Sequence, residues 1–340
     1  DLSSWELLNL RVDDILKLSP DIQKNFNISS STLQAAMGPY NVQNIGMAEF
    51  YHRYLPDLTP EQPAIMAPST MHYSWPKAAA VLGLGSNCIR HIHVDLDCRM
   101  NTVHLRQHLD ECLEKKIPVL QVVAVIGTTE ESAVDPLDEI VRIREEYRQA
   151  GLDFELHLDA AWGGYFASMI RGEGAYLGVS NAGFKNTPAM TMGDYVRRQY
   201  DAFPHADSIT VDPHKGGFIP YPAGALCYRN GGQRDLVAFT APVVYHGGVD
   251  PTVGVYGIEG SKPGAAAAGV YLSHRVIRAD TSGYGQILGK CFWNSKRLYA
   301  EILTLEERNE DVPFIVRTVQ RPPAERAGEP KGKVRDQVEL

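Results

Sequence analysis

The stretch DSITVDPHKGGFIPYPAG, from Asp207 to Gly224, places one lysine shortly after a strand-like apolar run. The run SITV is typical of a β-strand, and the two glycines after Lys215 indicate a tight turn at the end of that strand. A lysine in an arbitrary turn usually points into solvent. Ligands of open parallel sheets, however, collect beyond the carboxyl ends of the strands. The position of Lys215 therefore favours a functional role if the surrounding strands are parallel.

Strands and helices alternate around this stretch, which predicts an α/β fold with a mainly parallel sheet. The run PVLQVVAVIG at 118–127 is continuously apolar, as in a strand buried on both faces. The amphipathic segment at 101–116 predicts a helix capped by Asn101. Further strands are expected at 64–69, 88–94, 154–164, 206–212 and 224–229, and further helices at 75–83 and 135–151.

Three regions are expected along the chain. Residues 1–63 form a helical lead-in segment, 64–297 a large domain, and 298–340 the beginning of a small C-terminal domain with a polar tail. Within the large domain, residues 166–206 interrupt the alternation with Gly, Asn, Pro and Met. These residues are predicted to form an insert or a long loop.

The composition argues against several classes of protein. The formal net charge is −8, with no basic run before the KGKVR segment near the end, so nucleic-acid binding is not expected. No apolar stretch approaches the length that spans a bilayer, and the first residues show no signal-peptide pattern, so no membrane association is expected. The five cysteines lack C-x-x-C spacing, which predicts reduced thiols and a cytoplasmic location.

Polar side chains stand at the ends of four expected strands. They are His72, Thr128, Thr129, Asp159, His214 and Lys215. Because the carboxyl ends of parallel strands share one edge of a sheet, we expect these side chains to meet in one site. A lysine amine can form a Schiff base with a carbonyl cofactor, and an aspartate opposite a pyridine nitrogen keeps that nitrogen protonated. The set indicates a site for a cofactor of this kind.

Each of these residues also has a structural interpretation. Asp159 could cap a helix that begins in AAWGG, and Thr128 and Thr129 could start the turn before the next helix. A single histidine such as His72 is more often an ordinary core or surface residue. Only the agreement of several neighbouring motifs favours the functional interpretation of Lys215.

A metal site is not expected. His104 and His108 lie four residues apart on an expected helix, which is a metal-ligand spacing. No glutamate follows His104, and no third ligand is evident in the sequence. A solvated helix face is the better interpretation of this pair.

The motifs STMHYSWPKA (69–78), HLDAAWGG (157–164) and DPHKGG (212–217), in this order, resemble the pyridoxal-phosphate-dependent group II amino-acid decarboxylases. The segment GIEGSKPGAAAAGVYLSHRVI at 257–277 is most similar to the tyrosine and aromatic amino-acid branch. The resemblance covers roughly residues 64–295. It implies a fold-type-I pyridoxal-phosphate enzyme, a homodimer, and decarboxylation of an L-amino acid, tyrosine-like in its side chain, to an amine and CO₂.

The resemblance also implies roles for the residues around the cofactor ring. Lys215 would form the Schiff base, and Asp159 would pair with the pyridine nitrogen. His72 would stack on one face of the ring, and Ala161 would pack on the other. Thr129 would lie near the ring hydroxyl.

Further roles follow from the same resemblance. His214 would reach the cofactor phosphate, with Asp212 also among the cofactor-binding residues. Ser261 would contact the phosphate from a neighbouring subunit. Tyr221 would lie near the substrate and, with His72, is a candidate proton donor. Tyr221 could instead belong to a rigid loop framed by prolines, and Ser261 could cap the helix that follows it.

The sequence departs from the family in one respect. The Ser/Thr-Gly-Gly turn that normally binds the cofactor phosphate, upstream of the stacking histidine, is not found before His72. We expect that residues outside this chain supply that turn; the alternative is a diverged, non-catalytic scaffold protein. Within enzymes, the alternative is a lyase of the sphingosine-phosphate-lyase type, because EGSKPG at 259–264 is similar to an element of those enzymes.

Overall fold

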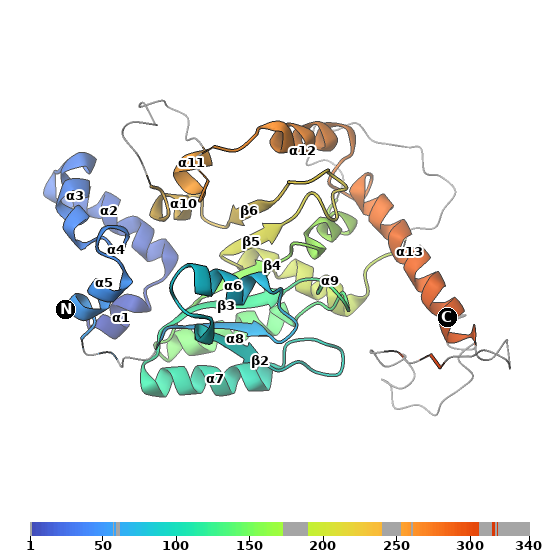
Figure 1. Ribbon diagram of the computed structural model, residues 1–340, viewed down its shortest axis with the longest axis horizontal. Helices are drawn as coiled ribbons and strands as arrows, with labels where there is room; N and C mark the ends of the chain where they lie inside the picture. The colour runs from blue at the N-terminus through green and yellow to red at the C-terminus, as the bar shows by residue number, and fades with distance from the viewer. Residues whose placement is uncertain are drawn as a thin grey trace.

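In the described part of the chain, a sheet of six strands forms the centre of the computed structural model (Figure 1). The structure describes residues 2–56, 58, 62–172, 190–239, 253–259, 261–305, 315, 316 and 318. The strands are β1 (Ala64–Pro68), β2 (Ile89–Ile92), β3 (Val119–Val125), β4 (Glu155–Asp159), β5 (Ser208–Val211) and β6 (Ala225–Tyr228). They lie in the order β2-β1-β3-β4-β5-β6. Every neighbouring pair is parallel except β5 and β6, which confirms the predicted mainly parallel sheet.

Helices connect these strands, as the alternating pattern predicted. They are α6 (Ser74–Val81), η2 (Ser86–Cys88), α7 (Thr102–Lys115), α8 (Leu137–Gln149), η3 (Gly163–Met169), α9 (Asp194–Asp201) and η4 (Phe203–His205). α7 begins at the predicted cap, because the Asn101 side chain accepts hydrogen bonds from the main-chain N–H groups of Val103 and His104.

The two faces of the sheet are covered differently. Leu105 and Leu109 of α7 and Ile140 and Ile143 of α8 are fully buried in the main core, together with Val122 of β3. α6 packs on the opposite face through Ala79, which contacts a smaller buried cluster that includes Ile89. Alternate residues of β3 and β4 therefore point toward either α7 and α8 or the face that carries α6.

The lead-in segment is helical, as predicted, and lies at one end of the molecule (Figure 1). Its elements are α1 (Ser4–Leu8), α2 (Val12–Phe26), α3 (Ser30–Met37), η1 (Gly38–Tyr40), α4 (Val42–Ile45) and α5 (Met47–Tyr54). Polar contacts fix this segment to the sheet domain. Asn9 accepts a hydrogen bond from the Asp153 main-chain N–H at 2.7 Å, and Asp13 pairs with Arg229 at 3.1 Å.

The remaining helices follow β6. They are α10 (Gln233–Leu236), α11 (Val253–Tyr256), α12 (Ala265–Val276) and α13 (Tyr284–Leu303). α13 runs without interruption across residue 298, where the sequence suggested that a second domain begins. The predicted insert at 166–206 contains the end of η3 and the helix α9, whereas its residues 173–189 lie outside the described residues.

Two expectations about the chemistry of the whole chain can be compared with the structure. All five cysteines carry free thiols. Among the described residues, no helix combines the length and apolarity needed to cross a membrane.

Candidate active site

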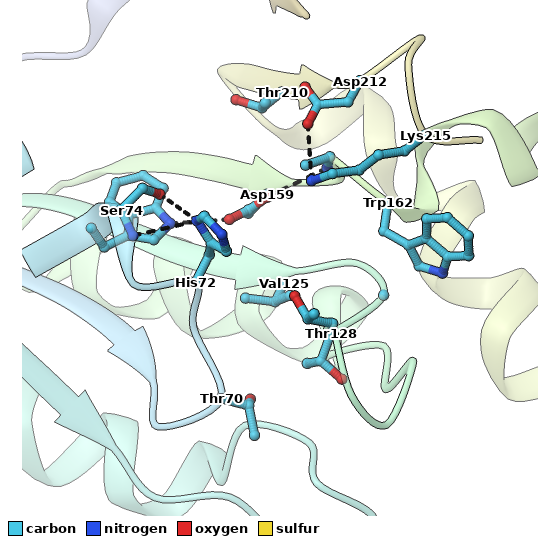
Figure 2. Close-up of a pocket in the computed structure, with 14 residues that line it drawn as sticks. Thr70, His72, Ser74, Val125, Thr128, Asp159, Trp162, Thr210, Asp212 and Lys215 are labelled. Carbon is cyan, nitrogen blue, oxygen red and sulfur yellow. Dashed lines mark hydrogen bonds and ion pairs between the residues drawn. The ribbon is translucent and has the colours of Figure 1, made fainter. Parts of the chain in front are cut away.

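A cavity of about 230 Å³ opens where β1, β3, β4 and β5 end (Figure 2). The sequence-predicted site residues that line it are His72, Thr128, Thr129, Asp159, Ala161, Asp212 and Lys215. The strand register explains why they meet. Val125, Asp159 and Thr210 are direct neighbours across three strands, so their side chains share one face at the same height.

Lys215 lies on the turn that follows β5, and its amine points to Asp212. The amine nitrogen is 3.0 Å from Asp212 Oδ2, and the Lys215 main-chain N–H donates to the Asp212 carbonyl at 2.9 Å. A carboxylate and a local turn together hold the lysine at the cavity (Figure 2). About a third of the Lys215 side chain is exposed, so a ligand in the cavity can reach the amine.

The glycines after Lys215 are explained by close packing. A Cβ on Gly217 would lie 2.5 Å from Tyr165 Cζ and 2.6 Å from the Pro213 carbonyl oxygen. A side chain at this position would push the turn away from Tyr165. The buried Tyr284 of α13 adds a further constraint, because its hydroxyl donates to the Gly217 carbonyl at 2.9 Å.

Asp159 is the carboxylate at the floor of the cavity. The Trp75 indole N–H donates to Asp159 Oδ2 at 3.1 Å, and the Ala161 main-chain N–H approaches Oδ1 at 3.4 Å. Asp159 ends β4 and no α-helix starts after it, so it does not cap a helix as the structural alternative suggested. Two N–H donors orient the carboxylate while leaving it able to accept another hydrogen bond.

His72 lies on the loop after β1 and is oriented by Ser74. The main-chain N–H of Ser74 donates to His72 Nδ1 at 3.3 Å, and the Ser74 hydroxyl lies 2.8 Å from the same nitrogen. A main-chain N–H can only donate, so Nδ1 is the acceptor and the neutral ring carries its proton on Nε2.

A buried histidine lies beneath Asp159 on the same strand. His157 Nδ1 is 2.8 Å from the Ser208 hydroxyl, and its Nε2 is 3.1 Å from the Thr210 hydroxyl. Burial lowers the pKa of His157 to about 4, with the Asp159 carboxylate opposing that shift. The ring is therefore neutral at physiological pH.

The loop after β3 is held by buried polar groups. The Thr128 hydroxyl accepts a hydrogen bond from the Ala133 main-chain N–H at 2.9 Å, so Thr128 shapes the loop, and Thr129 is the exposed member of the pair. The fully buried Asp135 accepts hydrogen bonds from the N–H groups of Val125 and Met100, each at 2.7 Å. These bonds fix the end of β3 where it meets the cavity.

Three sequence-predicted site residues lie outside the cavity lining. His214 Nδ1 lies 2.5 Å from the Ala223 carbonyl, its ring packs against Tyr221 at a centroid distance of 3.8 Å, and its Nε2 is 3.7 Å from Asp212 Oδ2. Tyr221 itself is 75% exposed. Ser261 is exposed on the segment before α12, where Gly264 and not Ser261 caps the helix.

Sequence reasoning missed other residues that line the cavity. Thr70, Ser74, Trp75 and Thr210 also contribute to its walls. Thr210 could have been found from its alternation with Ser208 on one strand. The position of Trp75 depends on how α6 packs on the sheet, which no local pattern reports.

His104 contacts two other histidine rings, those of His93 and His108. His104 stacks on His93 at a centroid distance of 3.9 Å, and His108 meets His104 edge-on at 4.6 Å. Within the residues that the structure describes, no group of three His, Cys, Asp or Glu side chains is arranged to hold a metal ion.

Comparison with known proteins agrees with this geometry. Residues 28–318 match the model of the pyridoxal-dependent decarboxylase conserved domain. The chain is 35% identical to L-tyrosine decarboxylase of Enterococcus faecium over 298 residues, which are 85% of this chain and 46% of that protein. It is 32% identical to L-tyrosine decarboxylase of Enterococcus faecalis over 330 residues, 94% of this chain and 50% of that protein. The chain thus spans about half the length of the curated relatives it matches.

A solved structure supports the fold. Mouse CSAD in apo form superimposes with a TM-score of 0.56 at 18% sequence identity, covering 98% of this chain and 65% of that chain. At this identity the likeness shows the fold, which is that of the fold-type-I pyridoxal-phosphate enzymes, as the sequence predicted. The family match covers most of the chain and includes every residue that lines the cavity. The chain therefore belongs to the pyridoxal-dependent decarboxylase family.

Proposed function

We propose that this protein removes the carboxyl group of an aromatic L-amino acid, tyrosine first, and releases the amine and CO₂. The observation that carries the proposal is the convergence of Lys215, Asp159 and His72 on one cavity. The names of the relatives at 35% and 32% identity, both L-tyrosine decarboxylases, support the choice of substrate.

The residues present fit pyridoxal phosphate, the cofactor of this family. Lys215 offers an amine for the aldehyde, and Asp159 offers a carboxylate for the ring nitrogen. The small side chain of Ala161 leaves room beside the backbone for a flat ring. Thr70 Oγ1 is buried at the cavity and has no hydrogen-bond partner among the described residues, so it is a polar atom that a ligand can satisfy.

The volume of the cavity sets a limit on what the described residues enclose. About 230 Å³ is less than the roughly 300–1,000 Å³ of pockets that surround a drug-sized ligand. We propose that these residues form the floor and ring-binding walls. The cofactor phosphate would be bound in part by His214, Asp212, Thr129 and Ser261. The rest of its binding site would come from a turn that the described residues do not include.

When bound, pyridoxal phosphate supplies an aldehyde and a protonated ring that accepts the electron pair of the breaking bond. Lys215 would hold the cofactor through its aldehyde. Asp159 would hold the proton on the ring nitrogen, and His72 would cover one ring face. His72, through its Nε2–H, or Tyr221 would return a proton to the carbon that loses CO₂.

Side chains near the cavity favour an aromatic substrate over an acidic one. Trp162 lines the cavity, and Phe218 is exposed on the lysine turn. No arginine lines the cavity within the described ranges, so a second carboxylate would find no cationic partner there.

We also propose a cytoplasmic homodimer. The five free thiols are consistent with a reducing compartment. The segment around α12 exposes Ile258, Tyr271 and Leu272, an apolar surface near Ser261 of the kind that a partner subunit covers.

Amine release tests the proposed activity. The purified protein, incubated with pyridoxal phosphate, should release tyramine and CO₂ from L-tyrosine. Dihydroxyphenylalanine, tryptophan and glutamate serve as competing substrates. Release from glutamate alone would overturn the substrate assignment. Cofactor bound to Lys215 without release of any amine would favour the scaffold alternative, and cleavage of a phosphorylated long-chain amino alcohol would favour the lyase alternative.

A further inference from the structure

Trp75 makes a directed contact with the Asp159 carboxylate. Its indole Nε1–H donates to Asp159 Oδ2 at 3.1 Å, between residues 84 positions apart in the sequence. Trp75 belongs to α6, on the face of the sheet that carries the cavity, and lines that cavity. Because an indole nitrogen can only donate, the direction of this hydrogen bond is fixed.

The Trp75 ring is itself held in place from below. Its edge packs against His157, with ring centroids 5.4 Å apart and an angle of 64° between the planes. His157 is fixed at both of its nitrogens by Ser208 and Thr210. The Trp75 ring thus packs against the neutral His157 ring, which two hydrogen bonds hold in place, and its N–H donates to one oxygen of Asp159.

The two N–H donors contact different oxygens of the Asp159 carboxylate. Trp75 binds Oδ2, and the Ala161 main-chain N–H approaches Oδ1 at 3.4 Å. The terminal torsion of an aspartate is otherwise broad, so one donor on each oxygen restricts the plane of the carboxylate. Each oxygen keeps a second lone pair, which leaves Asp159 able to bind a third N–H from the cavity.

We propose that Trp75 is a positioning residue whose indole N–H orients the Asp159 carboxylate toward the ring nitrogen of the bound cofactor. This inference rests on the proposed function and deepens it. A neutral donor suits the role, because a lysine or arginine in its place would neutralise Asp159 and weaken its attraction for the ring proton. Trp75 acts through Asp159 and supplies no group to the reaction.

The hydrogen bond can be tested in the protein without cofactor. The chain has four tryptophans, so a ¹H–¹⁵N spectrum should contain four indole N–H signals. Trp75→Phe assigns one of them by its loss. Asp159→Ala should move that signal upfield and leave the other three in place. An unmoved Trp75 signal would refute the contact, and this measurement does not require the Trp75 variant to be active.

The positioning role is tested by binding of pyridoxal phosphate. Trp75→Phe keeps an aromatic ring against His157 but removes the N–H, and should weaken cofactor binding by about 10- to 150-fold, the loss expected for one hydrogen bond to a charged group. In an Asp159→Ala background the same substitution should change affinity by less than ~2-fold, because the acceptor of the indole N–H is gone. Trp293→Phe, on α13 and outside the cavity lining, is the matched control and should leave affinity unchanged.

Turnover provides the second measurement. Trp75→Phe should lower kcat with amino acid and leave KM unchanged, since the proposed role of Trp75 is exerted through Asp159 and not on the substrate. An effect on cofactor affinity that persists undiminished in the Asp159→Ala background, or a change in KM alone, would overturn the inference. Cofactor affinity is read from absorbance, so a protein that binds pyridoxal phosphate and decarboxylates nothing refutes the proposed function while the double-variant comparison still decides the role of Trp75.

Discussion

The amine of Lys215 lies 3.0 Å from Oδ2 of Asp212, three residues earlier on the same turn. The lysine that the sequence singled out therefore reaches the cavity already paired with a carboxylate. A cofactor aldehyde that bonds to this amine has to compete with that ion pair. The pair is partly exposed, which keeps the competition mild, because solvent weakens partly exposed ion pairs.

Lys215→Ala should abolish the link between protein and cofactor that borohydride makes permanent. The reason is that Lys215 supplies the only cavity-lining amine within the described residues. Mass spectrometry of the reduced, digested protein measures the adduct. Lys77→Ala, on the exposed side of α6, is the control and should retain it. An adduct that maps to another lysine would contradict the assignment of the site.

Asp159→Asn should lower kcat by about 10²-fold or more while the protein stays folded, because a neutral amide cannot hold the ring nitrogen protonated. The free energy of unfolding should fall by only about 1–2 kcal/mol, since the amide oxygen still accepts from Trp75. Assays of amine release measure the change in kcat, and urea unfolding measures the change in the free energy of unfolding. Asp201→Asn, exposed at the end of α9, should alter neither. Normal turnover in Asp159→Asn would refute the proposed role of Asp159, which is to keep the ring nitrogen protonated so that the ring can accept electrons.

Gly217→Ala should destabilise the protein by about 1–3 kcal/mol, because the new methyl group would overlap Tyr165 and the Pro213 carbonyl. The displaced turn should also weaken the reducible cofactor link. Gly231→Ala is a matched control, since a Cβ there meets nothing within 4 Å. Equal unfolding midpoints for the two variants would show that the turn does not need its glycine.

His157 should make the stability depend on pH. Its pKa in the folded state, about 4, lies below its ordinary value of 6.5, so the unfolded chain binds more protons between these values. The free energy of unfolding should therefore fall as the pH falls from 6.5 to about 4, by up to about 3 kcal/mol from this residue. Urea unfolding at several pH values measures the slope.

The control for this slope is a histidine in solvent. His157→Gln should flatten the dependence, and His205→Gln, exposed on η4, should not. Burial raises the pKa of Asp135 to about 7, so its contribution changes with the opposite sign, declining as the pH rises from 3.8 to about 7. Asp135 contributes equally to the parent and to the His157→Gln variant, so the difference between their slopes reports His157 alone. An unchanged slope would show that His157 is not the residue responsible.

Periodicity and cap chemistry predicted most of the sheet domain. The apolar run at 118–127 became β3, and Asn101 caps α7 as expected. The direction of β6 could not be read from the sequence, because orientation depends on how the chain returns to the sheet and not on local pattern. α9 was not foreseen within the segment at 166–206, since its burial through Tyr200 relies on contacts with distant residues.

The residues of the candidate site could likewise be predicted only in part from the sequence. Lys215, Asp159 and His72 follow strand ends, and the strand order alone brings such residues together. Trp75 and His157 could not be assigned roles, because their partners are set by helix packing and by the register between β4 and β5. The expected role of His214 at the phosphate stays a prediction; its Nδ1 contacts the Ala223 carbonyl, a position set by the conformation of the loop after Lys215.

The hydrogen bond from Tyr284 to Gly217 has a consequence for the order in which the protein matures during synthesis. Every strand that the structure describes precedes residue 229, so this sheet can assemble before α13 has left the ribosome. The hydrogen bond from Tyr284 to the turn that carries Lys215 can form only after residue 284 has emerged and docked. The strands and the Lys215–Asp212 pair can therefore be in place before Tyr284 adds its contact to the turn.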